Sequence, residues 1–342
     1  MATAARLAGL RVRHRTARVR SALLLICLMI LGIVLTLMSG PSMTSPADLL
    51  RVLAGEDLPG ISFAVLELRL PRAMLSVLAG MSFGLGGAVF QTLLRNPLAS
   101  PDIIGISAGA SAAAVFAIVI LGWSGASVSV LAVLCGLLVA LAIYLLAWRD
   151  GVSGARLILI GIGISAMLDS LIAYVILQAP AWTLQDALRW LTGSVNGATL
   201  GGSLPVAVSL AGFGGLIFVR QRALEALRLG DETATALGVP LARDKALMVL
   251  AGVGLIAVAT AVSGPIAFVA FLSGPIARRI AGPGRSPLIP AALVGAILVL
   301  TGDYAGQHLF AGRYPAGVVT GALGAPVLLL LITRSNRNGT ET

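Results

Sequence analysis

The chain has 342 residues, of which 58% are hydrophobic, 11% charged and 5% aromatic. Soluble domains are about 25% charged, so this chain has too few charges to cover the surface of a soluble domain of its size. The composition excludes a disordered chain, a disulfide scaffold and an ordinary cytosolic enzyme, and it predicts an all-α polytopic membrane protein surrounded by lipid. A net charge of +10 would suggest nucleic acid in a soluble protein, but here membrane topology explains it and no nucleic-acid partner is expected.

Ten stretches are predicted to cross the membrane, because each has the roughly 20 mainly apolar residues that a spanning helix needs. They cover residues 22–40, 72–93, 102–121, 126–147, 156–178, 201–219, 244–262, 264–282, 287–305 and 315–333. The eighth stretch is the weakest, since Gly264, Pro265, Gly274 and Pro275 interrupt it. A broken or re-entrant helix is expected there.

The basic residues predict the orientation of these helices. If the N-terminus is cytoplasmic, five of the 24 arginines and lysines fall on the outer side, namely Arg51, Arg69, Arg72, Arg189 and Arg313. The rest fall inside, as the positive-inside rule requires. Both termini are therefore expected in the cytoplasm, with a basic arm at residues 1–21, a transmembrane domain at 22–333 and a tail at 334–342.

Two of the outer arginines stand at the start of the second stretch, in Leu68-Arg69-Leu70-Pro71-Arg72. Pro71 suits the first turn of a helix. Arg69 and Arg72 run against the positive-inside trend, and two interpretations remain open. Their stems could snorkel to lipid headgroups, or their charges could pair with acidic residues of an external binding protein and steer its docking.

Glycines are concentrated in the same stretch, at Gly80, Gly84, Gly86 and Gly87. In lipid, small residues let helix backbones approach closely. The pattern fits either tight bundle packing or a bundle whose faces slide to open a wide path.

Two further features lie along the second stretch and at its inner end. Met81 and Gln91 are candidates to line a translocation path, because a large polar cargo would be expected to slide past a weakly interacting wall. Arg95, Asn96 and Pro97 form a tight inner turn, and turn chemistry alone could explain them.

The longest charged inner loop, residues 220–243, contains a predicted two-turn helix. Its residues are Asp231, Glu232, Thr233, Ala234, Thr235, Ala236, Leu237 and Gly238. Asp231 is expected to cap the N-terminus, Gly238 to take the left-handed C-terminal position and Pro240 to stop the helix. Because so short a helix is marginal alone, it should dock either on this chain's own inner surface or, as a coupling helix, in a cleft of a cytoplasmic ATPase.

The sequence offers no energy source of its own. A Walker A loop needs a lysine followed by Ser or Thr, but the only lysine, Lys245, is followed by Ala246. Nucleotide-driven transport would therefore need separate ATPase subunits that bind ATP and Mg, with no cofactor or metal held by this chain. Cys27 and Cys135 are interpreted as small packing residues.

Ion-coupled transport is the rival hypothesis. It would usually place ionisable residues inside the membrane, and Asp169 and Asp303 are the candidates. An intramembrane enzyme is not expected, because no set of nucleophile and base converges in the sequence.

Several segments, taken together and in order, carry a family resemblance. They are Arg69-Leu-Pro-Arg72, Gln91 with Arg95-Asn-Pro-Leu-Ala99, Gly105 through Gly109-Ala110, Thr233-Ala-Thr-Ala-Leu-Gly238, Gly264-Pro-Ile-Ala-Phe268, and Pro315-Ala-Gly-Val-Val-Thr320 with Gly324-Ala-Pro326. The chain resembles FecCD-type permeases of ATP-binding-cassette importers, which move ferric siderophores, haem and cobalamin. Within this family it is most similar to ferric-enterobactin permease subunits.

The resemblance implies an inner-membrane permease with ten spans, which imports a ferric siderophore by alternating access and makes no covalent change. It also implies the partners: a second, non-identical permease, two cytoplasmic ATPase subunits and an extracytoplasmic siderophore-binding protein. It assigns residues 231–238 as the coupling helix and places Arg69 and Arg72 against the binding protein. Haem or cobalamin is the alternative cargo.

Overall fold

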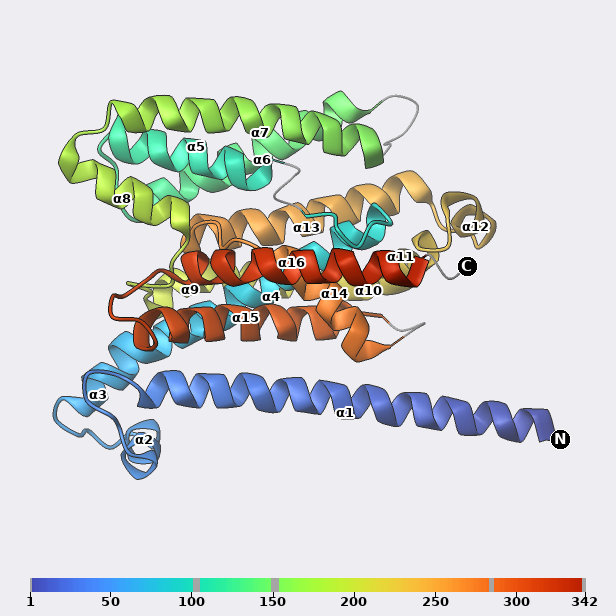
Figure 1. Cartoon of the computed structure of the whole chain (residues 1–342), viewed down its shortest axis with the longest axis horizontal. Helices are drawn as coiled ribbons and strands as arrows, with labels where there is room; N and C mark the ends of the chain where they lie inside the picture. The colour runs from blue at the N-terminus through green and yellow to red at the C-terminus, as the bar shows by residue number, and fades with distance from the viewer. Residues whose placement is uncertain (1, 101–104, 149–153, 283–285, 340–342) are drawn as a thin grey trace.

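The computed structural model describes residues 2–100, 105–148, 154–282 and 286–339, and every regular element in these ranges is helical. The predicted all-α fold is therefore confirmed. The helices run side by side as one bundle along its long axis (Figure 1). Both ends of the described chain lie at the end of the bundle that carries the short helix α12 (Asp231–Ala236).

Seven helical segments are long and apolar enough to cross a membrane. They contain α1 (Ala2–Met38), α4 (Leu70–Leu93), α6 (Ala126–Ala147), α7 (Gly154–Leu177), the rod α9–η3–α10 (Leu200–Ser209, Leu210–Gly214 and Gly215–Val219), α13 (Leu241–Ser263) and α15 (Leu288–His308). Two shorter apolar segments form α5 (Ile106–Val119) and most of α16 (Ala316–Gly339), and a further helix, α14 (Val269–Ala281), ends in two arginines. Each of the ten predicted stretches thus overlaps one of these ten helical segments.

Two of these helices are shorter than predicted. The eighth stretch forms a helix only at α14, whose 13 residues span about 20 Å, less than the roughly 30 Å of a bilayer core. The chain before it turns through positive φ angles of 69° at Gly264 and 62° at Phe268. The expected break is therefore present. The third stretch forms α5, with 14 residues, which follows Gly105 at a φ of 79°; residues 102–104 of this stretch lie outside the described residues.

The second stretch starts earlier than predicted. A single helical segment runs from Ile61 to Leu93, made of α3 (Ile61–Phe63), the π-helical η1 (Ala64–Arg69) and α4. Pro71 therefore lies inside this rod and not at its beginning. Proline has no N–H for the helical ladder, and the π-helical turn immediately before it accommodates the missing bond.

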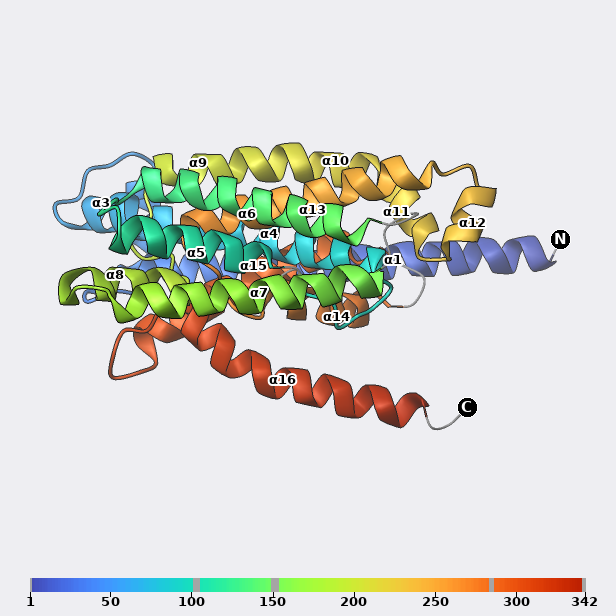
Figure 2. The ribbon, with the colours of Figure 1, turned by 90° about the horizontal axis from the view of Figure 1, so that it is seen from above.

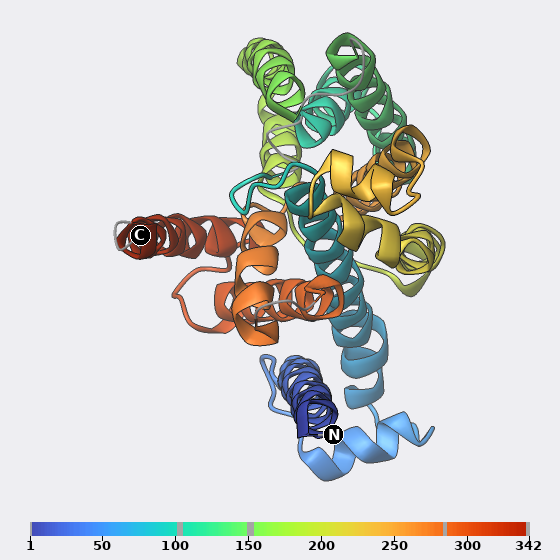
Figure 3. The ribbon, with the colours of Figure 1, turned by 90° about the vertical axis from the view of Figure 1, so that its right-hand side faces the viewer.

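The rod α4 lies at the centre of the bundle and makes its closest backbone contacts through glycine (Figure 3). A Cβ atom at Gly84 would lie 2.2 Å from the carbonyl oxygen of Ala291 on α15, and one at Gly87 would lie 1.9 Å from that of Ala270 on α14. A Cβ at Gly295 of α15 would lie 2.1 Å from the carbonyl of Gly80. These contacts support tight packing as the role of the glycines.

Short helices close the two ends of the bundle. At one end lie α2 (Pro46–Leu53), α3 and α8 (Ala181–Thr192), and at the other lie α11 (Gln221–Leu227) and α12 (Figure 1). The sequence predicts the α12 end to be cytoplasmic. Helix α1 continues without a break through residues 2–21 of the predicted arm, residue 1 lies outside the described residues, and the boundary of that arm stays a prediction. Helix α16 diverges from the bundle along its length (Figure 2).

Candidate functional site

The first predicted docking residue, Arg69, is engaged inside the chain. Its side chain is 8% exposed. Its guanidinium donates to the carbonyl oxygens of Leu37 at 2.8 Å and Ser42 at 3.0 Å and to Oγ1 of Thr44 at 2.9 Å. Arg69 therefore ties the end of α1 to η1 and offers no free charge to a partner in this conformation.

The second docking residue, Arg72, forms an ion pair with Asp303 of α15. Nε and Nη2 each donate to one carboxylate oxygen at 2.6 Å. This fork geometry is the strong form of an arginine–carboxylate contact. The side chain of Asp303 is 4% exposed and that of Arg72 is 19% exposed. Docking by these two arginines stays a prediction, because a partner's carboxylates would have to compete with contacts already made.

The second ion-coupling candidate, Asp169, is not near this pair. It lies on the exposed face of α7, while Asp303 lies on α15, on the opposite side of α4 (Figure 3). The two acids therefore form no common site, and Asp303 is already neutralised by Arg72. Within the described ranges, no cluster of His, Cys, Asp or Glu is arranged to hold a metal ion.

The predicted inner helix is present as α12, but its N-terminus differs from the prediction. The N-cap is Gly230, with a φ of 115°, and no side chain caps the helix. Asp231 is instead its first residue, and its carboxylate points back to the bundle to contact Arg95 and Lys245. The other end agrees with the prediction, because Gly238 adopts a φ of 81° and its N–H donates to the carbonyl of Thr235.

Most of α12 faces away from its own chain. Ala234 is fully buried, whereas Glu232, Thr233, Thr235, Ala236 and Leu237 are exposed. Leu237 is 63% exposed and Leu229, just before the helix, is 65% exposed. Two exposed leucines beside a short helix at the end of a bundle are suited to docking in an apolar cleft of another protein.

The inner turn after α4 closes around α12. Arg95 has a φ of 49°, and its Nε donates to the carbonyl of Leu227 at 3.1 Å while Nη2 contacts Asp231. Asn96 accepts the N–H of Leu98 at 2.9 Å through Oδ1. Asn96 and Pro97 therefore form the turn that the sequence predicts. Arg95 also contacts Leu227 and Asp231, which the sequence does not predict.

The two predicted lining residues lie in different environments. Gln91 is 1% exposed; its Nε2 donates to the carbonyl of Phe271 at 2.9 Å, and its Oε1 accepts from Arg278 at 2.7 Å. In this conformation Gln91 therefore joins α4 to α14, and its lining role stays a prediction. Met81 is half-buried beside an apolar cavity of about 220 Å³ between α4, the η3–α10 segment and α15. Its lining role stays a prediction.

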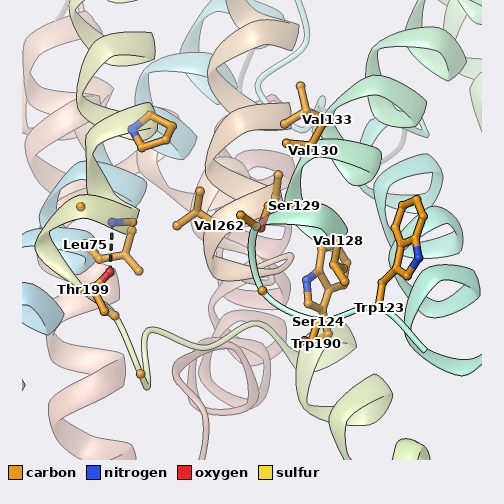
Figure 4. A pocket seen from close by; sticks show the side chains of 18 of the residues that line it. Leu75, Trp123, Ser124, Val128, Ser129, Val130, Val133, Trp190, Thr199 and Val262 are labelled. Carbon is orange, nitrogen blue, oxygen red and sulfur yellow. Dashed lines mark hydrogen bonds between the residues drawn. The ribbon is translucent and has the colours of Figure 1, made fainter. Parts of the chain in front are cut away.

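A larger cavity, of about 860 Å³, lies at the end of the bundle opposite α12. Its walls come from α6, α13 and the segment around Thr199 that leads into α9, with Trp123, Val128 and Trp190 gathered at one side (Figure 4). Most of the labelled side chains are apolar, and among the described residues Asp186 is the one charged side chain that lines it. The cavity contains none of the residues that the sequence singled out.

The sequence missed the ion pairs that join distant segments. Arg72 and Asp303 are 231 positions apart, and Arg95 and Asp231 are 136 apart. One signal was available for the first pair, because an outer arginine and an acid at the outer end of another span can neutralise each other. No pattern in the sequence pointed to the second.

Comparisons with known proteins agree with this geometry. Residues 28–334 match the FecCD transport family. The chain is 39% identical over 319 residues to the ferric enterobactin transport system permease protein FepG of Escherichia coli K12, which covers 92% of this chain and 96% of that protein. It is 34% identical over 305 residues to the iron(3+)-hydroxamate import system permease protein FhuG of Bacillus subtilis 168, with coverage of 85% and 90%. Among solved structures, an inward-facing metal-chelate type ABC transporter superposes with a TM-score of 0.82, at 25% identity, over 92% of this chain and 98% of that one.

Proposed function

This chain belongs to the FecCD transport family, and from that membership we propose that it is the permease subunit of an importer for a ferric catecholate siderophore such as enterobactin. It is a multi-pass membrane protein and a transport component of an ATP-binding-cassette importer, not an enzyme. Its relatives support iron-chelate uptake as the activity. The family resemblance is therefore confirmed, while the cargo and the partners of this chain are proposals.

The observation that carries the proposal is the geometry of α12. This helix stands at one end of the bundle, it docks on its own chain chiefly through Ala234, and it leaves Leu237 exposed. In the proposed mechanism two cytoplasmic ATPase subunits bind ATP and Mg, and one of them receives residues 231–238 in a cleft. Closure of the ATPase dimer then moves α12 and switches the bundle between outward-open and inward-open states.

The unpartnered faces of α7 and α16 support a second permease subunit. On α7, Leu159, Met167 and Leu177 are 72%, 73% and 85% exposed. The exposed Asp169 lies among them, and a carboxylate facing hydrocarbon is costly. We therefore place this face toward the partner, where a water-filled path between two non-identical permeases would surround Asp169. The 860 Å³ cavity is lined by α6 and by the segment that leads into α9. These two elements lie on the side of the bundle away from α16 (Figure 3), so the cavity does not belong to the face that we assign to the partner.

The choice of a catecholate cargo rests on the identity to FepG. The hydroxamate permease FhuG is less similar, at 34% against 39%. Uptake of ⁵⁵Fe from a panel of siderophores in a deletion strain, with and without the restored gene, tests this choice. Restoration by a catecholate chelate alone is expected. Restoration only by a hydroxamate chelate would change the cargo, and so would restored uptake of radiolabelled haem or cobalamin in parallel assays.

The energy source is tested separately in vesicles that contain the whole importer. Replacing the catalytic glutamate of the ATPase subunit should abolish uptake while leaving the complex assembled. An uncoupler, with ATP kept high, should leave uptake intact. The reverse result would favour an ion-coupled transporter, against which stands the pairing of Asp303 with Arg72.

A further inference from the structure

We propose that Asp231, Arg95 and Lys245 form a joint that passes the motion of α12 into the bundle. The inference rests on the proposed function and adds the residues through which the coupling helix acts. Hereafter these three residues are called the α12 joint. They are positioning residues, since none of them needs to touch the cargo or the nucleotide.

The joint connects three elements through one carboxylate. One oxygen of Asp231 pairs with Nη2 of Arg95, and the other accepts from Nζ of Lys245 at 2.5 Å. Arg95 follows the end of α4 directly, and Lys245 lies in the first turns of α13. The helices α4 and α13 are among the most deeply packed spanning helices of the bundle: 78% of the most apolar window of the α4 segment and 67% of that of α13 are buried. A displacement of Asp231 therefore acts on two central rods at once.

The position of Arg95 is fixed from two sides. Its left-handed backbone, at a φ of 49°, turns the chain sharply after α4, a conformation that non-glycine residues adopt infrequently. Its Nε also donates to the carbonyl of Leu227 at the end of α11. The guanidinium thus bridges the last residue of α11 and the first residue of α12, and it holds the link between these helices against α4.

Few other contacts hold α12 to the bundle. Ala234 is its only buried residue, and a helix of six residues has little stability of its own. The start of the same loop is held by Arg220, whose Nη1 lies 3.5 Å from the buried carboxylate of Asp244 on α13. Asp244 and Lys245 are neighbours on α13. This helix therefore anchors the loop at two places: before α12 through Arg220, and at α12 through Asp231.

The carboxylate of Asp231 keeps its charge at cellular pH. Partial burial alone would raise the pKa of the Asp231 carboxyl, but the hydrogen bonds and charges of Lys245 and Arg95 outweigh it and hold this pKa below its ordinary value of 3.8. The side chains of Asp231 and Arg95 are 44% and 45% exposed, and exposed pairs add little to stability. The role we assign to them is therefore geometric.

A second contact extends the connection from α4 to α14. Gln91 lies one turn before Arg95 and binds the carbonyl of Phe271. Pro275 has no N–H for that carbonyl, which is four residues earlier in the helix, so Gln91 supplies the missing donor. Arg278 then donates to Gln91. Movement of the inner end of α4 would thus reach the short helix α14, which follows the break at Gly264–Phe268.

The test compares ATP hydrolysis with ⁵⁵Fe-siderophore uptake in vesicles that contain the complete importer. The variants are Arg95→Gln, Asp231→Asn and the double variant. Each should keep ATP hydrolysis but lower the uptake per ATP by about tenfold, within the range of measured couplings between sites. The double variant should be no worse than either single one, because the residues act as one unit. Asp231→Glu, which keeps the carboxylate, should recover at least half of the parent ratio.

The matched control is Glu225→Gln, which removes one exposed carboxylate from α11. Glu225 accepts from Gln221 on the same helix at 2.7 Å, so this contact joins no second element and the parent ratio is expected. Parent-like uptake per ATP in Arg95→Gln and Asp231→Asn, or losses that multiply in the double variant, would overturn the joint. If neither Asp231→Asn nor Asp231→Glu assembles into the importer, the role of Asp231 is merely structural and the proposed joint is also overturned. A parent importer that neither hydrolyses ATP nor takes up iron would instead contradict the proposed function.

Discussion

Individual charged side chains in this bundle bind mainly to groups of their own chain. Arg69, Arg72 and Asp231 each attracted a functional interpretation from the sequence, and each has intramolecular partners in the structure. The same residue can serve both purposes, but the internal contact exists before any partner binds. Substitutions at these positions therefore need a stability readout beside the transport readout.

The pair Arg72–Asp303 gives the first such prediction. Asp303→Asn should lower the free energy of unfolding by about 3–5 kcal/mol, because it leaves a poorly solvated guanidinium without its counter-charge. Thermal unfolding of the purified subunit in detergent measures the loss. The double variant Arg72→Met with Asp303→Leu should recover most of it. A single variant as stable as the parent would show that the pair contributes nothing.

Gln91 gives a second prediction at this scale. Gln91→Leu leaves the carbonyl of Phe271 and the guanidinium of Arg278 without a partner, and each unsatisfied group costs about 1–3 kcal/mol. The unfolding midpoint should fall clearly. Gln221→Leu, which removes an exposed hydrogen bond on α11, is the control and should change it little. Equal midpoints for Gln91→Leu and the parent would contradict the assigned contacts.

The pH dependence of α12 follows from Asp231. Because the pKa of this carboxyl is lowered in the folded chain, its contribution is present above the ordinary value of 3.8 and is lost as the pH falls through the lowered folded value. Hydrogen exchange of the α12 amides, corrected for intrinsic rates, should show constant protection from pH 8 to about 5 and a loss only below the ordinary carboxyl range. Asp231→Asn should lack this transition; the same acid-induced loss in that variant would assign it to another group.

At the scale of elements, glycine sets how closely the rods approach. Gly84→Ala should destabilise the subunit by about 1–3 kcal/mol, as overpacking does, because its Cβ would lie 2.2 Å from a backbone oxygen of α15 that has no room to move. Gly212→Ala in η3 is the control, since no atom lies within 4 Å of its added Cβ. The unfolding midpoints of the two variants test this prediction. Equal midpoints would argue against the close contact between α4 and α15 at Gly84.

The sequence predicts elements better than it predicts their contacts. Gly264 and Pro265 predicted the break before α14, and Gly238 predicted the end of α12, because backbone conformation is a local property of these residues. Asp231 was misassigned as a cap, because a capping carboxylate and one paired across the fold look the same in a sequence. The burial of Gln91 was missed for a related reason. A polar residue in an apolar stretch can face a path, or it can donate a hydrogen bond to a carbonyl of a neighbouring helix that a proline has left without its usual partner.

At the scale of the whole molecule, the bundle has buried central rods and exposed outer spans, among which α7 is the most exposed. The rods α4, α13 and α15 are mostly buried, while only 11% of the most apolar window of α7 is buried. Helix α16 leaves the bundle beyond its first turns (Figure 2). Its start is held by backbone contact, since a Cβ at Gly317 would lie 1.8 Å from the carbonyl of Thr192, and the N–H of Gly317 donates to the carbonyl of Gly193. The first turns of α16 are thus fixed, and Gly324 further along still packs against Phe268, whereas Leu323 beside it is 63% exposed.

This asymmetry predicts where the second permease binds. Met167→Trp on α7 and Leu323→Trp on α16 place a large side chain at positions that are 73% and 63% exposed; each should reduce co-purification with the partner permease several-fold, because an interface tolerates added bulk poorly. Leu204→Trp on α9, at 62% exposure, is the matched control and should leave co-purification unchanged, since a tryptophan there meets only lipid. If Leu204→Trp breaks the complex and the other two do not, the partner occupies the α6–α9 side, and the exposed Asp169 would need a different explanation from the water-filled path that we propose.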